Sequence, residues 1–109
     1  MKETKIIPGG VAVDDRGSVK FVNDFDFSGV KRFYQVDNHS QGFIRAWHGH
    51  KKEGKYVYVA KGSALVGAVE MEVREHVEGI AHDGLISPEG EVFKCVLSSQ
   101  SPKVLWIPP

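Results

Sequence analysis

The stretch GFIRAWHGHKKEGKYVYVAKG, residues 42–62, decides the fold prediction. It places His48 and His50 one residue apart, then continues with a lysine-rich turn and a run that alternates Tyr and Val. Because side chains two positions apart in a strand point to the same side, a strand here would present both imidazoles on one face. Three interpretations fit this pattern: a metal site, a catalytic base inside a barrel, and a polar stretch of an ordinary strand.

The composition predicts one globular domain that covers residues 1–109. Apolar residues make up 41% of the chain and charged residues 26%, with 12 glycines. A chain of this length buries roughly 60 to 70% of the surface that its unfolded form exposes, so its core is small. The 14 basic and 14 acidic residues cancel. This balance argues against a general surface for nucleic acid or anionic membranes and confines any anion site to a local cluster.

The sequence also predicts a cytoplasmic protein. Cys95 is the only cysteine, so no intrachain disulfide can form, and this usage fits a reducing compartment. The opening residues MKETKIIPGG contain no apolar signal region. No run approaches the roughly 18 apolar residues of a membrane-spanning helix.

Strand signals dominate the chain and predict an all-β fold. Short runs rich in Val, Tyr, Phe and Ile are separated by Gly, Pro, Asn or Asp clusters, which suggests a sandwich, a jelly roll or a small barrel. Residues 24–29 could form one helical turn. The predicted strands are 18–22, 32–36, 42–48, 55–60, 63–73, 91–97 and 103–107.

The last predicted strand, KVLWI (103–107), is followed by Pro108 and Pro109. An apolar strand before Pro-Pro is equally consistent with a chain that is cut short and with an edge strand that the prolines end. In either case the strand would leave an apolar edge. We therefore expect a homodimer that shares strands at such edges.

The spacing within residues 42–62 resembles the first motif of the cupins, a family of small jelly-roll barrels. That motif is Gly, five residues, His-x-His, three or four residues, Glu, six residues and Gly; Gly42, His48, His50 and Gly62 fit it. Lys55 stands where the metal-binding Glu would be. A lysine cation would repel a divalent metal, so the resemblance implies a jelly roll (double-stranded β-helix) that uses proton chemistry, with no metal and no other cofactor.

Two further points concern this motif. Glu53 stands two residues before the expected Glu position, in the turn, and is the remaining candidate for a metal ligand in a metal-dependent cupin. Tyr56 and Tyr58 have the opposite parity to Lys55. If Lys55 points into the barrel, we expect both tyrosines on its outer face.

Five segments, in order, resemble dTDP-4-dehydrorhamnose 3,5-epimerases and related sugar-nucleotide epimerases. Each segment alone is a weak signal, but together they cover nearly all of the chain. They are DDRGSVKF (14–21), VDNHS (36–40), IRAWHGH (44–50), GKYVYVAKGSALVGAVEMEVR (54–74) and KVLWIPP (103–109). The resemblance implies a cupin that lacks its C-terminal part and acts on a 4-keto-6-deoxy nucleotide sugar.

The resemblance also implies roles for individual residues. His48 stands at the position of the general base, Lys55 at that of the cation that stabilises the enolate, and Asn38 at that of a residue near the nucleotide. Arg45 and Arg16 stand where arginines hold the diphosphate. These side chains suit these roles, since imidazole titrates at about pH 6.5, an ammonium stabilises developing negative charge, and guanidinium forks bind phosphate oxygens.

The chain also departs from the epimerase pattern. The family's Gly after the arginine is Ala46 here, and its Gln before the Asn is Val36. The aromatic residue and the carboxylate that follow Arg-Gly in the family are Val19 and Phe21 here. The family's proton-donating Tyr and the Asp that orients its base lie beyond the Leu-Trp-Ile-Pro strand, where this sequence ends. Strict alternation would also place the Arg45 side chain on the strand face opposite to that of His48, unless a bulge changes the direction of one of them.

A second resemblance leaves an alternative open. VKRFY (30–34) and HGHKK (48–52) are similar to segments of the sugar 3,4-ketoisomerases, cupins that act on the same class of substrate. A third possibility is a cupin that binds a carbohydrate or nucleotide sugar without turnover. For a ketoisomerase, the resemblance implies proton transfer by Tyr34, Arg45, His48 and His50.

Overall fold

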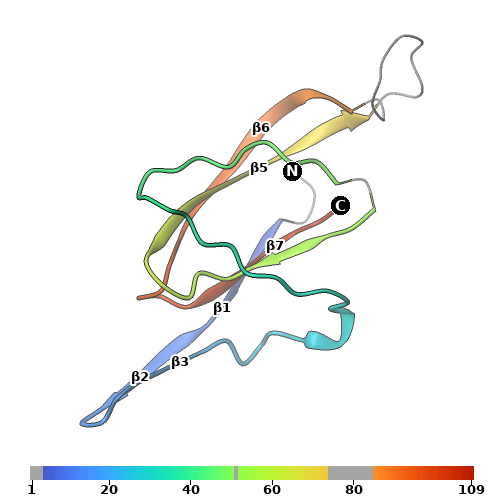
Figure 1. Cartoon of the computed structure of the whole chain (residues 1–109). Coiled ribbons are helices and arrows are strands. Elements are labelled where there is room, and N and C mark those ends of the chain that lie inside the picture. Colours follow the sequence, from blue (N-terminus) through green and yellow to red (C-terminus); the bar gives the residue numbers. More distant parts are fainter. Residues whose placement is uncertain (1–3, 51, 74–84) are drawn as a thin grey trace.

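The computed structural model describes residues 4–50, 52–73 and 85–109, with the side chains of 71–73 and 85–91 outside the description. The described chain is all-β (Figure 1). It contains no helix that is long and apolar enough to cross a membrane. Its elements are the strands β1 (Lys5–Pro8), β2 (Gly10–Asp14), β3 (Gly17–Phe21), β4 (Lys55–Val57), β5 (Ser63–Val73), β6 (Leu85–Ser98) and β7 (Lys103–Ile107), and the 3-10 helix η1 (Phe27–Gly29).

Strand β7 is the centre of a three-stranded antiparallel sheet in the order β1-β7-β4. Leu105 lies opposite both Ile6 of β1 and Val57 of β4. Val104 and Leu105 are buried, which explains why this strand is so apolar. The prediction that KVLWI forms an edge is therefore wrong, because β7 has a partner on each side and both of its hydrogen-bonding edges are used.

The longest strands, β5 and β6, form an antiparallel hairpin in which Ser63 lies opposite Ser98 and Val69 opposite Val92. The register shifts on either side of Met71, which marks an irregularity of the bulge type. Along β6 exposure alternates, with Leu97 buried and Val96 exposed. This period of two is that of a strand with one face covered, as predicted for residues 63–73 and 91–97.

A second hairpin, β2–β3, turns through two residues between Asp14 and Gly17. Gly17 has a φ of 139°, a left-handed backbone conformation that glycine adopts most easily. The side chain of Asp14 accepts a hydrogen bond from the backbone N–H of Arg16 at 2.8 Å, which closes the turn. Figure 1 shows this hairpin, in blue, extending away from the other strands.

Residues 30–50 differ most from the prediction. Strands were expected at 32–36 and 42–48, but the structure has no regular strand in either range. Apart from a turn at Gln41–Gly42, residues 31–50 have no regular backbone hydrogen bonding in the described part of the chain. Strand propensity reflects packing against neighbours, so Val, Tyr and Phe without a pairing strand do not make one. These residues cross the two larger sheets as an irregular segment in Figure 1.

The other local elements agree only in part with the sequence prediction. The helical turn expected within 24–29 is confirmed by η1, and its cap Asp26 accepts a hydrogen bond from the N–H of Ser28 at 2.8 Å. Strand β4 is shorter than the predicted 55–60. Strands β1 and β2 were missed.

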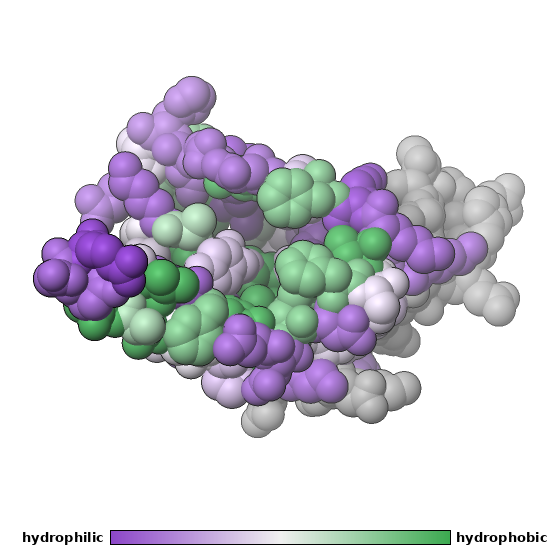
Figure 2. Space-filling view, turned by 90° about the horizontal axis from the view of Figure 1, so that it is seen from below, coloured by the Kyte–Doolittle hydropathy of each residue, from purple (hydrophilic) through white to green (hydrophobic). Residues whose placement is uncertain are grey.

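The core of the described chain is small, and the molecule is elongated. Its principal extents are 63 × 33 × 26 Å. The buried hydrophobic side chains of the described residues are Ala68, Leu97, Val104 and Leu105, whereas Val13 and Phe33 are 76% and 87% exposed. Figure 2 shows apolar side chains gathered across the middle of one face, with hydrophilic side chains around them. So large an exposed apolar surface is typical of an interaction face.

Candidate functional site

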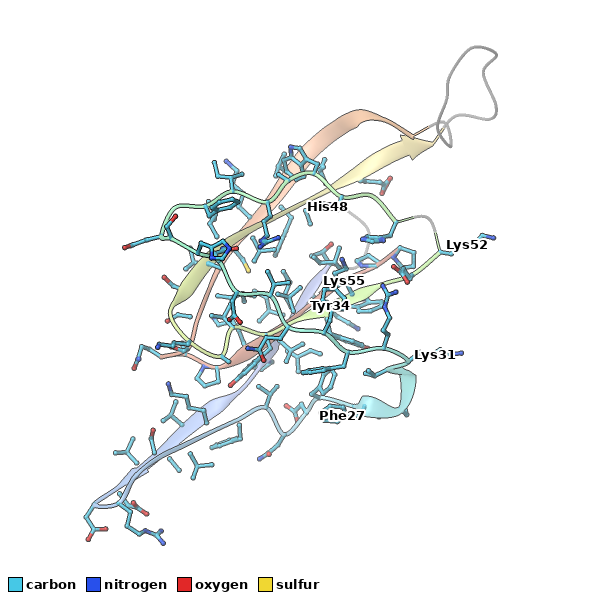
Figure 3. All side chains as sticks on the ribbon, in the orientation of Figure 1. Phe27, Lys31, Tyr34, His48, Lys52 and Lys55 are labelled. Carbon is cyan, nitrogen blue, oxygen red and sulfur yellow. The ribbon has the colours of Figure 1, made fainter. Side chains whose placement is uncertain are left out.

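Strand β4 begins at Lys55, which pairs with Ile107 of β7 and is half-buried. Its ammonium nitrogen lies 5.9 Å from the centroid of the Tyr34 ring, within the range of a cation–π interaction. Figure 3 shows the two side chains side by side near the middle of the molecule. Lys55 is therefore held against the irregular segment rather than directed freely into solvent.

The neighbouring Tyr56 makes a different set of contacts. Its ring centroid lies 4.6 Å from that of Trp106 and 4.8 Å from that of Phe25, which in turn packs edge-on against Phe27 at 4.5 Å. Strand alternation explains why adjacent residues of β4 serve separate clusters. Lys55 and Tyr56 therefore have different partners.

A second polar group lies at the turn that precedes β4. Glu53 Oε1 is 3.1 Å from Nδ1 of His50 and 3.7 Å from a terminal guanidinium nitrogen of Arg32. The Arg32 guanidinium also lies 5.7 Å from the Tyr34 ring centroid. These contacts connect residues 32–34 to residues 50–55.

The result is a continuous series of contacts that we call the site network. In order, it consists of His50, Glu53, Arg32, Tyr34 and Lys55. Three of its five members, Tyr34, His50 and Lys55, are residues that the sequence singled out. The network places an imidazole, a carboxylate, a phenol and two cations in one region of the chain, which is a suitable set of groups for proton transfer.

His48 lies outside this network. It is exposed and forms no hydrogen bond or ion pair with another described residue. Figure 3 shows it on the upper part of the irregular segment, above Lys55 and Tyr34 in that view. The adjacent Trp47 packs over β5, since a Cβ atom built on Gly67 would lie 3.4 Å from its ring. Trp47 therefore places this part of the segment against the β5–β6 hairpin.

The structure brings Arg45 and Asn38 together. Arg45 donates from Nε to the Asn38 side-chain oxygen at 2.7 Å and from a terminal nitrogen to the Asp37 carbonyl at 3.4 Å. The guanidinium also lies 5.9 Å from the Phe43 ring centroid. These contacts orient the guanidinium and leave its other terminal nitrogen for a further acceptor.

Arg16 lies apart from the other predicted site residues, at the tip of the β2–β3 hairpin (Figure 1). Its side chain is 87% exposed and donates to the Asp14 carboxylate at 3.2 Å from Nε and 2.6 Å from a terminal nitrogen. These side-chain hydrogen bonds, with a smaller contribution from the backbone N–H of Arg16, lower the pKa of Asp14 from its ordinary value.

Metal ligation has no support in the described part of the chain. No group of three or more His, Cys, Asp or Glu side chains there could hold a metal ion. Glu53, the remaining candidate for a ligand, pairs instead with His50 and Arg32.

Sequence analysis missed two members of the network. Glu53 was considered only as a metal ligand, although its position three residues after His50 could have indicated a pair across a turn. No sequence pattern predicted a role for Arg32, because its contact with Glu53 joins distant segments and depends on the course of the irregular segment.

The chain was also compared with known proteins. No protein-family model, no curated protein and no solved structure matches it.

Proposed function

We propose that this chain is a sugar-nucleotide epimerase with a cupin jelly-roll fold, acting on a 4-keto-6-deoxy nucleotide sugar. The observation that carries the proposal is the placement of Lys55, which is half-buried and held 5.9 Å from the Tyr34 ring centroid. A fixed ammonium can stabilise the negative charge that develops on a ketone oxygen when a neighbouring carbon loses a proton.

In this proposal His48 is the general base. Its exposed imidazole has no competing partner among the described side chains, so it is available to a substrate. It removes a proton next to the C4 ketone, and the electron pair moves onto the ketone oxygen beside Lys55. Return of a proton to the opposite face of the carbon inverts the centre. No metal or other cofactor takes part in this sequence.

The diphosphate is assigned to Arg45, with Asn38 near the nucleotide. The hydrogen bond between these residues supports the assignment, because it fixes the guanidinium before a ligand arrives. Arg16 is retained as a second diphosphate ligand only through the family resemblance. In the structure, its guanidinium forms an ion pair with the Asp14 carboxylate.

A 3,4-ketoisomerase is the second candidate, and the site network favours it specifically. The network includes Tyr34 and His50, the two residues whose presence in the site would support this reaction. A ketoisomerase relays protons between adjacent carbons, so it needs additional proton-transfer groups near the enolate. A phenol beside Lys55 fits this need.

The experiment is incubation with a dTDP-4-keto-6-deoxy sugar in deuterated water, followed by NMR. An epimerase incorporates deuterium at the carbons next to the ketone and inverts at least one of them. A ketoisomerase yields a 3-keto product. Binding without any exchange would overturn both enzyme proposals and leave a carbohydrate-binding cupin. His48→Gln should abolish exchange, while the matched change at another exposed imidazole, His39→Gln, should not.

Assembly is the last part of the proposal. The exposed apolar side chains, among them Val13 and Phe33, support association of two copies. The chain has a mass of 12.1 kDa, so light scattering should give twice this value. A mass of one chain at micromolar concentration would contradict the dimer.

A further inference from the structure

The carboxylate of Glu53 is the meeting point of two side chains from different segments. One oxygen, Oε1, lies 3.1 Å from Nδ1 of His50 and 3.7 Å from Arg32. The first contact is a close ion pair if the imidazole is protonated, and the second is a looser ion pair. The Glu53 carboxylate therefore contacts one particular imidazole nitrogen, Nδ1 of His50.

We infer that Glu53 is a positioning residue that fixes the orientation and the tautomer of His50, with Arg32 holding the carboxylate in place. This inference rests on the second candidate under the proposed function, the ketoisomerase, in which His50 takes part in the proton transfer. The epimerase and ketoisomerase resemblances described above give neither Glu53 nor Arg32 a role.

The physical reason is the chemistry of the two imidazole nitrogens. When Nδ1–H donates to a carboxylate, the lone pair of the neutral ring is on Nε2, the nitrogen that remains for a substrate. After Nε2 accepts a proton, the negative charge of Glu53 stabilises the imidazolium. A histidine without such a partner can exchange tautomers and rotate freely.

The proton balance of the step is complete. In the ketoisomerase reaction, Nε2 of His50 takes the proton from C3, next to the C4 ketone, and the electron pair of the C–H bond moves to the ketone oxygen beside Lys55. A proton then passes from the C3 hydroxyl to the C4 oxygen, the imidazolium gives its proton to C4, and the carbonyl re-forms at C3. No oxidant, reductant or metal is needed, and His50 ends neutral.

Stability alone does not explain the pair. The side chains of Glu53 and Arg32 are 54% and 70% exposed, and that of His50 is 32% exposed. Exposed ion pairs contribute little to folding. An orienting contact has a different requirement, since it needs only to favour one arrangement of the imidazole over the others.

The test uses the tautomer of His50, measured by imidazole nitrogen NMR of the full chain at a pH where the ring is neutral. In the unmodified protein we expect the proton on Nδ1. Glu53→Ala should move it predominantly to Nε2, whereas Glu53→Gln, whose amide oxygen still accepts a hydrogen bond, should keep it on Nδ1. Glu70→Ala, which removes an exposed carboxylate of β5, is the matched control and should change nothing.

The same variants are then assayed for deuterium exchange. Glu53→Ala should lower the exchange rate by about 10- to 100-fold without weakening substrate binding. A His50 proton already on Nε2 in the unmodified protein, or exchange that Glu53→Ala leaves intact, would overturn this inference alone. Absence of exchange in the unmodified protein, with the Nδ1 tautomer in place, would instead overturn the proposed function on which the inference rests.

Discussion

The ammonium of Lys55 lies over the ring of Tyr34, at 5.9 Å from its centroid. Lys55 begins a strand that is paired with β7, while Tyr34 belongs to the irregular segment. The contact therefore joins the three-stranded sheet to the irregular segment. It gives the cation a fixed place beside a phenol, and the first prediction tests that cation.

Lys55→Met removes the positive charge and keeps a side chain of similar length. If the ammonium stabilises an enolate, we expect the rate of deuterium exchange to fall by about 100-fold or more. Lys61→Met is the control, since Lys61 is an exposed lysine of the turn before Gly62 and should tolerate the change. Equal rates in both variants would remove Lys55 from the mechanism.

Arg45→Lys tests the diphosphate site. A lysine ammonium cannot reproduce the fork that binds the Asn38 side chain and the Asp37 carbonyl together. We expect the dissociation constant for dTDP, measured by calorimetry, to rise about 10-fold. Lys94→Ala removes an exposed cation on β6 and should leave the affinity unchanged. Loss of affinity in both variants would indicate only a general effect of charge.

Gly54→Ala tests how tightly the turn before β4 is packed. The Trp106 ring covers Gly54 so closely that a Cβ atom there would overlap its carbon atoms. Because Trp106 also packs against Tyr56 in a tilted ring contact, its ring cannot move without disturbing that contact. We expect the free energy of unfolding in urea to fall by about 1 to 3 kcal/mol.

The control for this substitution is Gly29→Ala. Nothing lies within 4 Å of a Cβ atom built at Gly29, and its φ is not left-handed. We expect a change within about 0.5 kcal/mol. If both alanine variants unfolded at the same urea concentration, Trp106 would have room to adjust and the packing argument would be wrong.

The strands that were predicted from the sequence are those whose own residues favour a strand. Residues 63–73 and 103–107 are rich in apolar residues, with several valines and an isoleucine, and both form strands with these bounds. Strand β1 was missed because KIIP is short and ends in proline, and its pairing with β7 joins opposite ends of the chain. When a strand depends on pairing with a distant segment, its own sequence gives little indication that it is a strand.

The site likewise combines local features, which the sequence predicts, with contacts between distant segments, which it does not predict. The His48 and His50 spacing and the position of Lys55 are local features, so the sequence could single them out. The pairing of Arg32 with Glu53 and the packing of Lys55 on Tyr34 depend on how residues 30–50 cross the sheets. Since the strand prediction for that segment was wrong, no argument from alternation could have placed these contacts.

The turn of the β2–β3 hairpin gives a prediction about pH. Hydrogen bonds from the Arg16 side chain, and then from its backbone N–H, lower the pKa of Asp14 from its ordinary value of 3.8. A carboxyl group with a lowered pKa in the folded state stabilises that state above the unfolded pKa. This contribution is lost as the pH falls below 3.8 and through the folded-state pKa.

Carbon NMR of the Asp14 carboxyl group checks this directly. In the unmodified protein its titration midpoint should lie below 3.8, and in Arg16→Gln it should move back towards 3.8 because the guanidinium hydrogen bonds are gone. Asp26 is the internal control. Its pKa is lowered by hydrogen bonds from Ser28, first from the backbone N–H and then from the side chain, so Arg16→Gln should leave it in place. An unchanged Asp14 midpoint in this variant would mean that the Arg16 side chain does not hold the turn in solution.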